Sequence, residues 1–107
     1  MSNNVFVPPL PMAGEIEAIR LSKSQEHLMT FSSMLYIRCQ IQNLLGRQFS
    51  PNTREVLLSN QEYAEMMAKV GVFLAKAEKM SIDSLKNLVS FYYRQSLFYQ
   101  QKNGIAQ

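Results

Sequence analysis

The chain has 107 residues, of which 47% are hydrophobic and 18% charged, and its formal net charge is +3. This length matches one domain, and the hydrophobic content excludes a disordered chain, which needs low hydrophobicity and high net charge. The single cysteine excludes an internal disulfide bond and a zinc site built from cysteines. No run approaches the roughly 20 apolar residues that cross a bilayer, and residues 1–14 lack the pattern of a signal peptide. We therefore expect a soluble, cytoplasmic protein with no membrane span.

Residues 1–14 are expected to form an extended, flexible N-terminal arm. Prolines at positions 8, 9 and 11 disfavour a helix and favour extended backbone. Phe6 and Leu10 make the arm apolar enough to dock into a groove on a neighbouring chain.

Residues 15–45 have the apolar periodicity of a helix, with one broad face around Phe31. A polar stretch interrupts this face between residues 20 and 27. A single helix of this length would be about 46 Å long at 1.5 Å per residue. Either it breaks near Ser22–Ser24, or its end packs on another subunit. Gly46 is a natural C-cap, residues 51–58 predict a short helix or a helical turn, and no strand is expected anywhere.

Residues 60–79 predict the second main helix, which begins with a capping box formed by Ser59 and Glu62. Its bulky apolar residues are expected to face the core. Beside them runs a stripe of small residues, namely Ala64, Ala68, Gly71 and Ala75. A helix that is apolar over more than half of its circumference needs cover on two sides, so we expect another backbone to approach this stripe closely.

Residues 82–102 predict the last helix, which follows Ser81 and is stopped by Asn103–Gly104. Its apolar surface exceeds what one helix contact needs. The complete prediction is an all-α fold: a small bundle or helical hairpin of three main helices, 15–45, 60–79 and 82–102, within one helical domain of residues 15–104.

Catalysis has little support in the sequence. The only histidine, His27, and the only cysteine, Cys39, are about 18 Å apart on one helix, too far to act together within a subunit. No cluster of metal ligands and no glycine-rich phosphate loop is present. We expect no enzyme activity, no cofactor, no metal and no small-molecule substrate.

The surplus of apolar helix surface predicts a non-catalytic protein–protein interaction module: a small adaptor or chaperone, an inhibitor, or a subunit of a helical oligomeric assembly. Its partner would be another protein or further copies of the chain. Arg38 is one of the candidate interface residues because it lies within an apolar helix face. Its guanidinium must either extend to the edge of that face or meet an acid on another helix or subunit. The candidate interface residues are Phe6, Leu10, Arg38, Ala64, Ala68, Gly71, Ala75, Phe91, Tyr93, Leu97 and Phe98.

The alternative prediction is a regulator that binds nucleic acid. Residues 1–65 hold five basic and six acidic residues, whereas residues 66–107 hold six basic and two acidic ones. A basic half can attract phosphates, although its charges are spread thinly and form no cluster. The candidate residues for this function are Lys76, Lys79, Lys86, Arg94 and Lys102.

Overall fold

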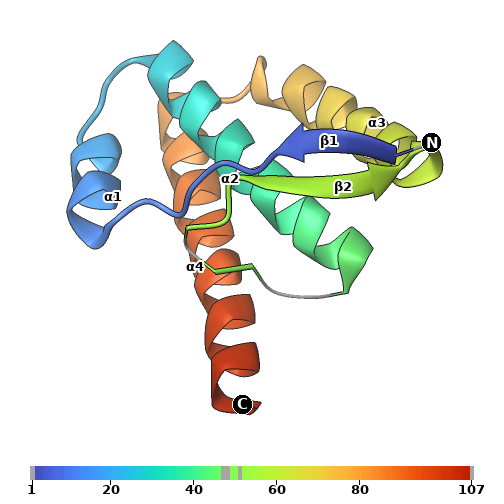
Figure 1. The fold of residues 1–107 in the computed structure, drawn as a ribbon. Coiled ribbons are helices and arrows are strands. Elements are labelled where there is room, and N and C mark those ends of the chain that lie inside the picture. Colours follow the sequence, from blue (N-terminus) through green and yellow to red (C-terminus); the bar gives the residue numbers. More distant parts are fainter. Residues whose placement is uncertain (1, 47–48, 51, 107) are drawn as a thin grey trace.

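The computed structural model describes residues 2–46, 49–50 and 52–106, and the side chains of these residues from 3 to 97. The described chain forms four helices and a two-stranded sheet (Figure 1). The mainly helical class is confirmed, but the expectation of three helices and no strand was wrong. The elements are β1 (Ser2–Phe6), α1 (Ala13–Arg20), α2 (Gln25–Leu45), β2 (Glu55–Ser59), α3 (Asn60–Ala77) and α4 (Ile82–Ala106).

The segment predicted as one helix over 15–45 is broken into α1 and α2, the first of the two outcomes foreseen for it. Helix α1 ends at Arg20, and Ser24 caps the start of α2 by accepting a hydrogen bond of 3.2 Å from the backbone of His27. At the other end of α2, Gly46 adopts the left-handed conformation, with φ 61°, as predicted for a C-cap.

Strands β1 and β2 pair antiparallel, with Val5 opposite Val56 and Asn4 opposite Leu57. The prediction of a helix or helical turn over 51–58 was therefore wrong for residues 55–58. In β2 the buried residues Val56 and Leu58 alternate with exposed ones, which gives the two-residue period of a half-buried strand. The first residues of the N-terminal arm thus pair within the chain itself.

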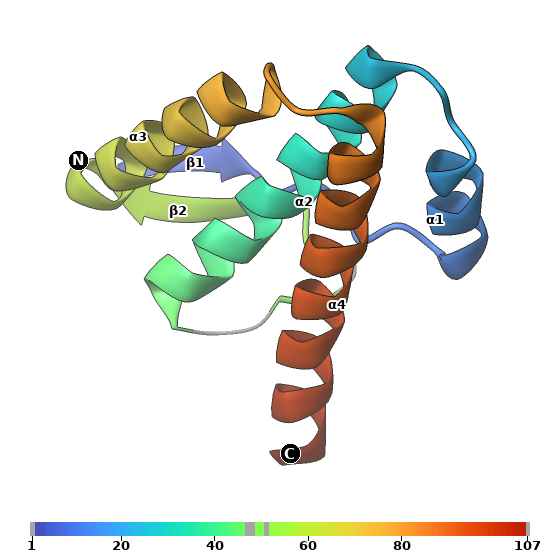
Figure 2. The same ribbon diagram turned by 180° about the vertical axis from the view of Figure 1, so that it is seen from behind.

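Helix α2 lies at the centre of the fold and connects two clusters of buried apolar residues. The first cluster joins α2 to α1, α4 and the end of α3, and the second joins α2 to the ribbon of β1 and β2 and to the first half of α3. Seen from behind, α4 runs across α2 (Figure 2). Tyr36 packs against both clusters and stacks on Phe73, with ring centroids 4.4 Å apart.

Helix α4 continues to Ala106, so Asn103–Gly104 does not end it as predicted. Helix α3 ends at Ala77, two residues before the predicted limit, and α1 begins at Ala13, two residues before the expected start of the helical region. The capping box of Ser59 and Glu62 is present at the start of α3, as predicted.

Candidate protein–protein interface

Helix α3 buries only one of its apolar faces within the chain. Met66, Val70, Phe73 and Ala77 point into the core. On one flank of this buried row large apolar side chains stay accessible: Met67 is 48% exposed, Tyr63 37% and Leu74 36%. These three and the four small residues of the predicted stripe form what we call the outer face of α3: Tyr63, Ala64, Met67, Ala68, Gly71, Leu74 and Ala75.

The small stripe lies in open space within the protomer. Ala64, Ala68, Gly71 and Ala75 are all exposed, and a Cβ atom placed on Gly71 would meet no atom within 4 Å. The second cover that we predicted for this helix is therefore not supplied by the described part of the chain. Against the described residues Gly71 makes no close packing contact that would offset its cost of about 1 kcal/mol relative to alanine in a helix.

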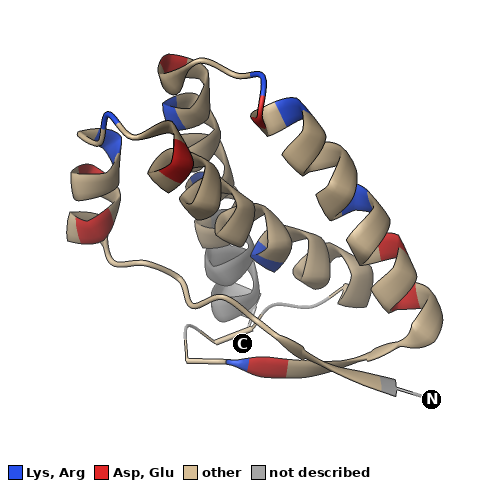
Figure 3. Cartoon of the chain, turned by 90° about the horizontal axis from the view of Figure 1, so that it is seen from above, with Lys and Arg blue, Asp and Glu red and all other residues tan. Residues whose placement is uncertain are grey.

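The charged residues beside the outer face are ordered by sign along α3. Glu62 and Glu65 lie in its first two turns, whereas Lys69 and Lys76 lie in its middle and near its end (Figure 3). Within the described chain neither Glu65 nor Lys76 forms an ion pair. One end of the helix surface is thus acidic and the other basic.

Arg38 is not available to a partner, because its side chain is only 1% exposed. Its guanidinium donates to the backbone carbonyl oxygens of Pro8 at 3.0 Å, Ser50 at 3.2 Å and Phe49 at 3.4 Å. Burial lowers the pKa of this guanidinium, and its Nε atom has no hydrogen-bond partner among the residues that the structure describes. The side chain neither extends to the edge nor meets an acid in the described chain, so our two expectations for it do not hold there.

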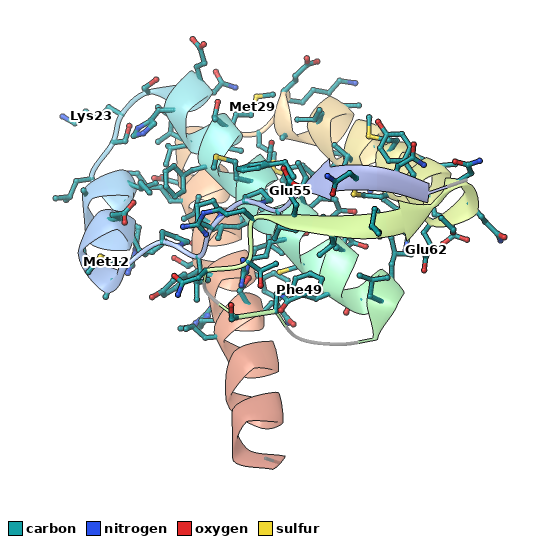
Figure 4. All side chains as sticks on the ribbon, in the orientation of Figure 1. Met12, Lys23, Met29, Phe49, Glu55 and Glu62 are labelled. Atoms are coloured by element: carbon teal, nitrogen blue, oxygen red, sulfur yellow. The ribbon has the colours of Figure 1, made fainter. Side chains whose placement is uncertain are left out.

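Gln42 lies one turn after Arg38 on α2 and is also buried. Its side-chain oxygen accepts a hydrogen bond of 3.3 Å from the backbone of Phe49. Phe49 itself packs into the second cluster, below the ribbon (Figure 4). Hydrogen bonds of Arg38 and Gln42 therefore hold the segments around Pro8 and Phe49 against α2.

The remaining interface candidates lie on other elements. Phe6 is 58% exposed on the outer side of the ribbon, beside Leu57, which is 64% exposed and was not predicted as a surface residue. Leu10 lines a hollow of about 390 Å³ together with Phe31 and Met34. On α4, Phe91 is 47% exposed, while Tyr93 and Leu97 are half-buried. The side chain of Phe98 lies outside the described residues.

The basic candidates do not gather on one surface of the described chain. Lys76 and Lys79 are exposed at the end of α3, and Arg94 lies on α4 beside Phe91 in a hollow of about 450 Å³. Lys86 shares another hollow with Glu17 and Asp83. The side chain of Lys102 is not among the described ones. Each described helix carries both acidic and basic positions (Figure 3).

The two residues weighed for catalysis have unlike environments. His27 is exposed, and its Nδ1 atom lies 3.2 Å from the hydroxyl of Ser22. Cys39 is buried, with Sγ 3.3 Å from the hydroxyl of Ser96, and burial raises the pKa of its thiol, which disfavours the nucleophilic thiolate. Among the residues that the structure describes, no three potential ligands are grouped to hold a metal ion.

None of the helices in the described chain is long and apolar enough to span a membrane. No family model matches the chain, and no match was found among known proteins or solved structures.

The bulky residues of the outer face were missed as surface residues in the sequence, where Tyr63, Met67 and Leu74 were counted among the bulky residues that face the core. The available signal was the width of the apolar arc, which exceeds what one core contact can cover.

Proposed function

We propose that the protein is a non-catalytic protein–protein interaction module that binds its partner through the outer face of α3. The observation that carries this proposal is the exposure of Tyr63, Met67 and Leu74 next to a stripe of small residues on one helix. Contiguous apolar surface of this kind is unfavourable in water, and it marks binding sites more often than single exposed residues do. The role is that of a small adaptor or chaperone, an inhibitor or a subunit of a helical assembly, which we place in the cytoplasm.

The shape of the face suits a helix as its counterpart. Small side chains let a second backbone come close, and the larger side chains along one edge then pack around it. Methionine adds an adaptable contact, because its unbranched thioether fits surfaces of different shape. The free energy of binding would come from removing Met67, Leu74 and Tyr63 from water.

The nucleic-acid alternative has weaker support. Its basic candidates are distributed over α3 and α4, and Lys86 has acidic neighbours. A phosphate-binding surface needs several basic groups on one side, and its affinity falls steeply with salt. A mobility-shift assay at low salt addresses it directly, and retarded nucleic acid that is released by added salt would favour this alternative.

The interaction proposal is tested by replacing one residue at the centre of the outer face. Ala68→Glu places a charge in the contact, whereas Ala18→Glu changes an exposed alanine on α1 in the same way. The tagged full-length chain is used to capture partners from its native extract, and bound proteins are quantified. We expect Ala68→Glu to reduce capture of a specific partner at least about tenfold, with no change for Ala18→Glu.

Equal capture by the two variants and the unaltered chain would show that the outer face is not the binding surface. Far-ultraviolet circular dichroism of both variants checks that each keeps its helices.

A further inference from the structure

We propose that the outer face of α3 binds a second copy of this chain, with the two α3 helices antiparallel around a two-fold axis near the middle of the helix. This inference rests on the proposed function and names the partner. The occupant is argued from the order of charges along α3, from the symmetry of the apolar residues between them and from the open position of the helix.

The charge order on α3 is complementary to itself only when the second helix runs in the opposite direction. An axis between residues 69 and 70 brings Glu65 of one copy near Lys76 of the other, and the two-fold axis repeats this contact. A parallel pair would set Glu beside Glu and Lys beside Lys. Lys69, near the axis, lies further round the helix from the small stripe, so its charge stays in water.

The small stripe has the same symmetry as the charges. Its members are separated by four, three and four residues, and this spacing reads identically in both directions. The axis between residues 69 and 70 therefore also sets Ala64 against Ala75 and Ala68 against Gly71 of the second copy. Small residues on both sides let the two backbones approach closely, which the exposed Gly71 permits.

The larger residues close the other edge of the contact. Tyr63, near the start of α3, comes opposite Leu74 of the second copy, and the contact is repeated by symmetry. Both side chains are about one-third exposed in the single chain, at 37% and 36%. The antiparallel arrangement also sets the positive end of each helix dipole beside the negative end of the other, which is favourable.

The position of α3 leaves room for the second copy. The helix lies along one flank of the molecule, with no other element outside it in the view of Figure 1 or in the view from above in Figure 3. Its inner side is held by α2 and by the ribbon, so the pairing requires no rearrangement of the core.

The first test is the mass of the purified full-length chain in solution. Sedimentation equilibrium from about 1 to about 200 µM covers the range of weak to moderate protein pairs. We expect a monomer–dimer equilibrium whose Kd rises at least about 100-fold in Ala68→Glu and is unchanged in Ala18→Glu. A monomer at all concentrations would overturn the proposal, as would a dimer that Ala68→Glu leaves intact.

The second test uses charge reversal to establish the direction of the helices. Glu65→Lys alone and Lys76→Glu alone each oppose like charges across the contact twice, and we expect the Kd to rise by about tenfold. The double variant Glu65→Lys/Lys76→Glu restores opposite charges and should return the Kd to within about threefold of the original. Weakening without restoration in the double variant would exclude the antiparallel arrangement.

The two proposals fail in different ways. A chain that remains monomeric while Ala68→Glu abolishes capture of another protein disproves self-association and leaves the proposed function standing. A chain that dimerises through another surface, with capture unaffected by Ala68→Glu, disproves both proposals.

Discussion

At Arg38 a buried positive charge is held by three backbone carbonyl oxygens, with no ion pair to a carboxylate in the described part of the chain. Each of these oxygens belongs to a connecting segment, one near Pro8 and the other at Phe49 and Ser50. A backbone carbonyl oxygen in a connecting segment does not accept the regular hydrogen bond of a helix or sheet. Burying such an oxygen without any donor costs free energy. The guanidinium satisfies all three because its donors diverge from one planar group.

The first prediction concerns this residue. Arg38→Met removes the three hydrogen bonds that this buried guanidinium donates, so we expect the free energy of unfolding to fall by about 3 kcal/mol. Arg38→Lys keeps the charge but cannot reach three acceptors, and we expect an intermediate loss. Urea titration followed by circular dichroism measures both.

The control for Arg38 is Arg20→Met on α1. Arg20 is exposed and forms a surface ion pair of 3.3 Å with Glu17, so its loss should change stability by less than about 0.5 kcal/mol. If Arg38→Met were equally harmless, the hydrogen bonds to Pro8, Phe49 and Ser50 would not contribute to stability.

At the scale of the element, the ribbon of β1 and β2 contributes one buried row of side chains and one exposed row. Leu58 is fully buried, whereas its neighbour Leu57 is 64% exposed. Adjacent residues of the same type therefore lie on opposite faces, which a strand requires.

The second prediction uses this contrast. Leu58→Ala should lower the free energy of unfolding by about 3 kcal/mol, because it removes buried methyl groups and leaves a cavity. Leu57→Ala should change it by less than about 0.5 kcal/mol. Chemical denaturation of the two variants provides the comparison, and similar losses at both positions would contradict the register of β2.

The helix ends were predictable from the sequence because the signals lie within a few residues of each other. Ser59 and Glu62 form the expected capping box, with hydrogen bonds of 2.8 and 3.1 Å, and Gly46 takes its expected conformation. The break before Ser24 was one of two stated alternatives. Each of these features depends on local backbone geometry, which the neighbouring side chains largely determine.

The strands could not be found in the same way. Each has five residues, too few for a clear two-residue period, and their pairing joins residues that are far apart in the sequence, such as Val5 and Val56. The partners of Arg38 escaped prediction for a related reason. They are backbone atoms, which every residue carries, so no side-chain pattern marks them.

The candidate surface was predictable in part. The small stripe on α3 was identified from its spacing, and it is exposed in the structure. Which bulky residues remain outside depends on where α2 and the ribbon contact α3, and Met66 and Met67 look alike in the sequence although only Met66 is buried.

At the scale of the whole molecule, three titratable side chains lie where α2, α3 and α4 meet. Tyr36 and Tyr92 have ring centroids 5.2 Å apart, and Sγ of Cys39 lies 3.5 Å from the backbone oxygen of Tyr92. Burial raises the pKa of the Cys39 thiol above its ordinary value of 9.0, and it raises the pKa of Tyr36 and Tyr92 above 10.0.

The third prediction follows from these directions. A group whose pKa is raised in the folded state stabilises the fold fully below its unfolded pKa, and this contribution is lost as the pH rises through the folded pKa. We expect the free energy of unfolding to decline from about pH 9 upwards, where the unfolded thiol ionises. Cys39→Ser should reduce the decline between pH 9 and 10, and urea titrations at a series of pH values measure it. An identical decline in this variant would show that Cys39 does not contribute.

The pairing of β1 with β2 also bears on how the protein is made. Strand β1 is synthesised before the other elements that the structure describes, yet its partner is complete only when Ser59 has been added. Until then Val5 and Val7 lack the cover that Val56 and Leu58 give them in the second cluster. Closing so long a loop is slow compared with forming α2. Strand β1 is therefore the first of the described elements to be made and among the last to be folded into place.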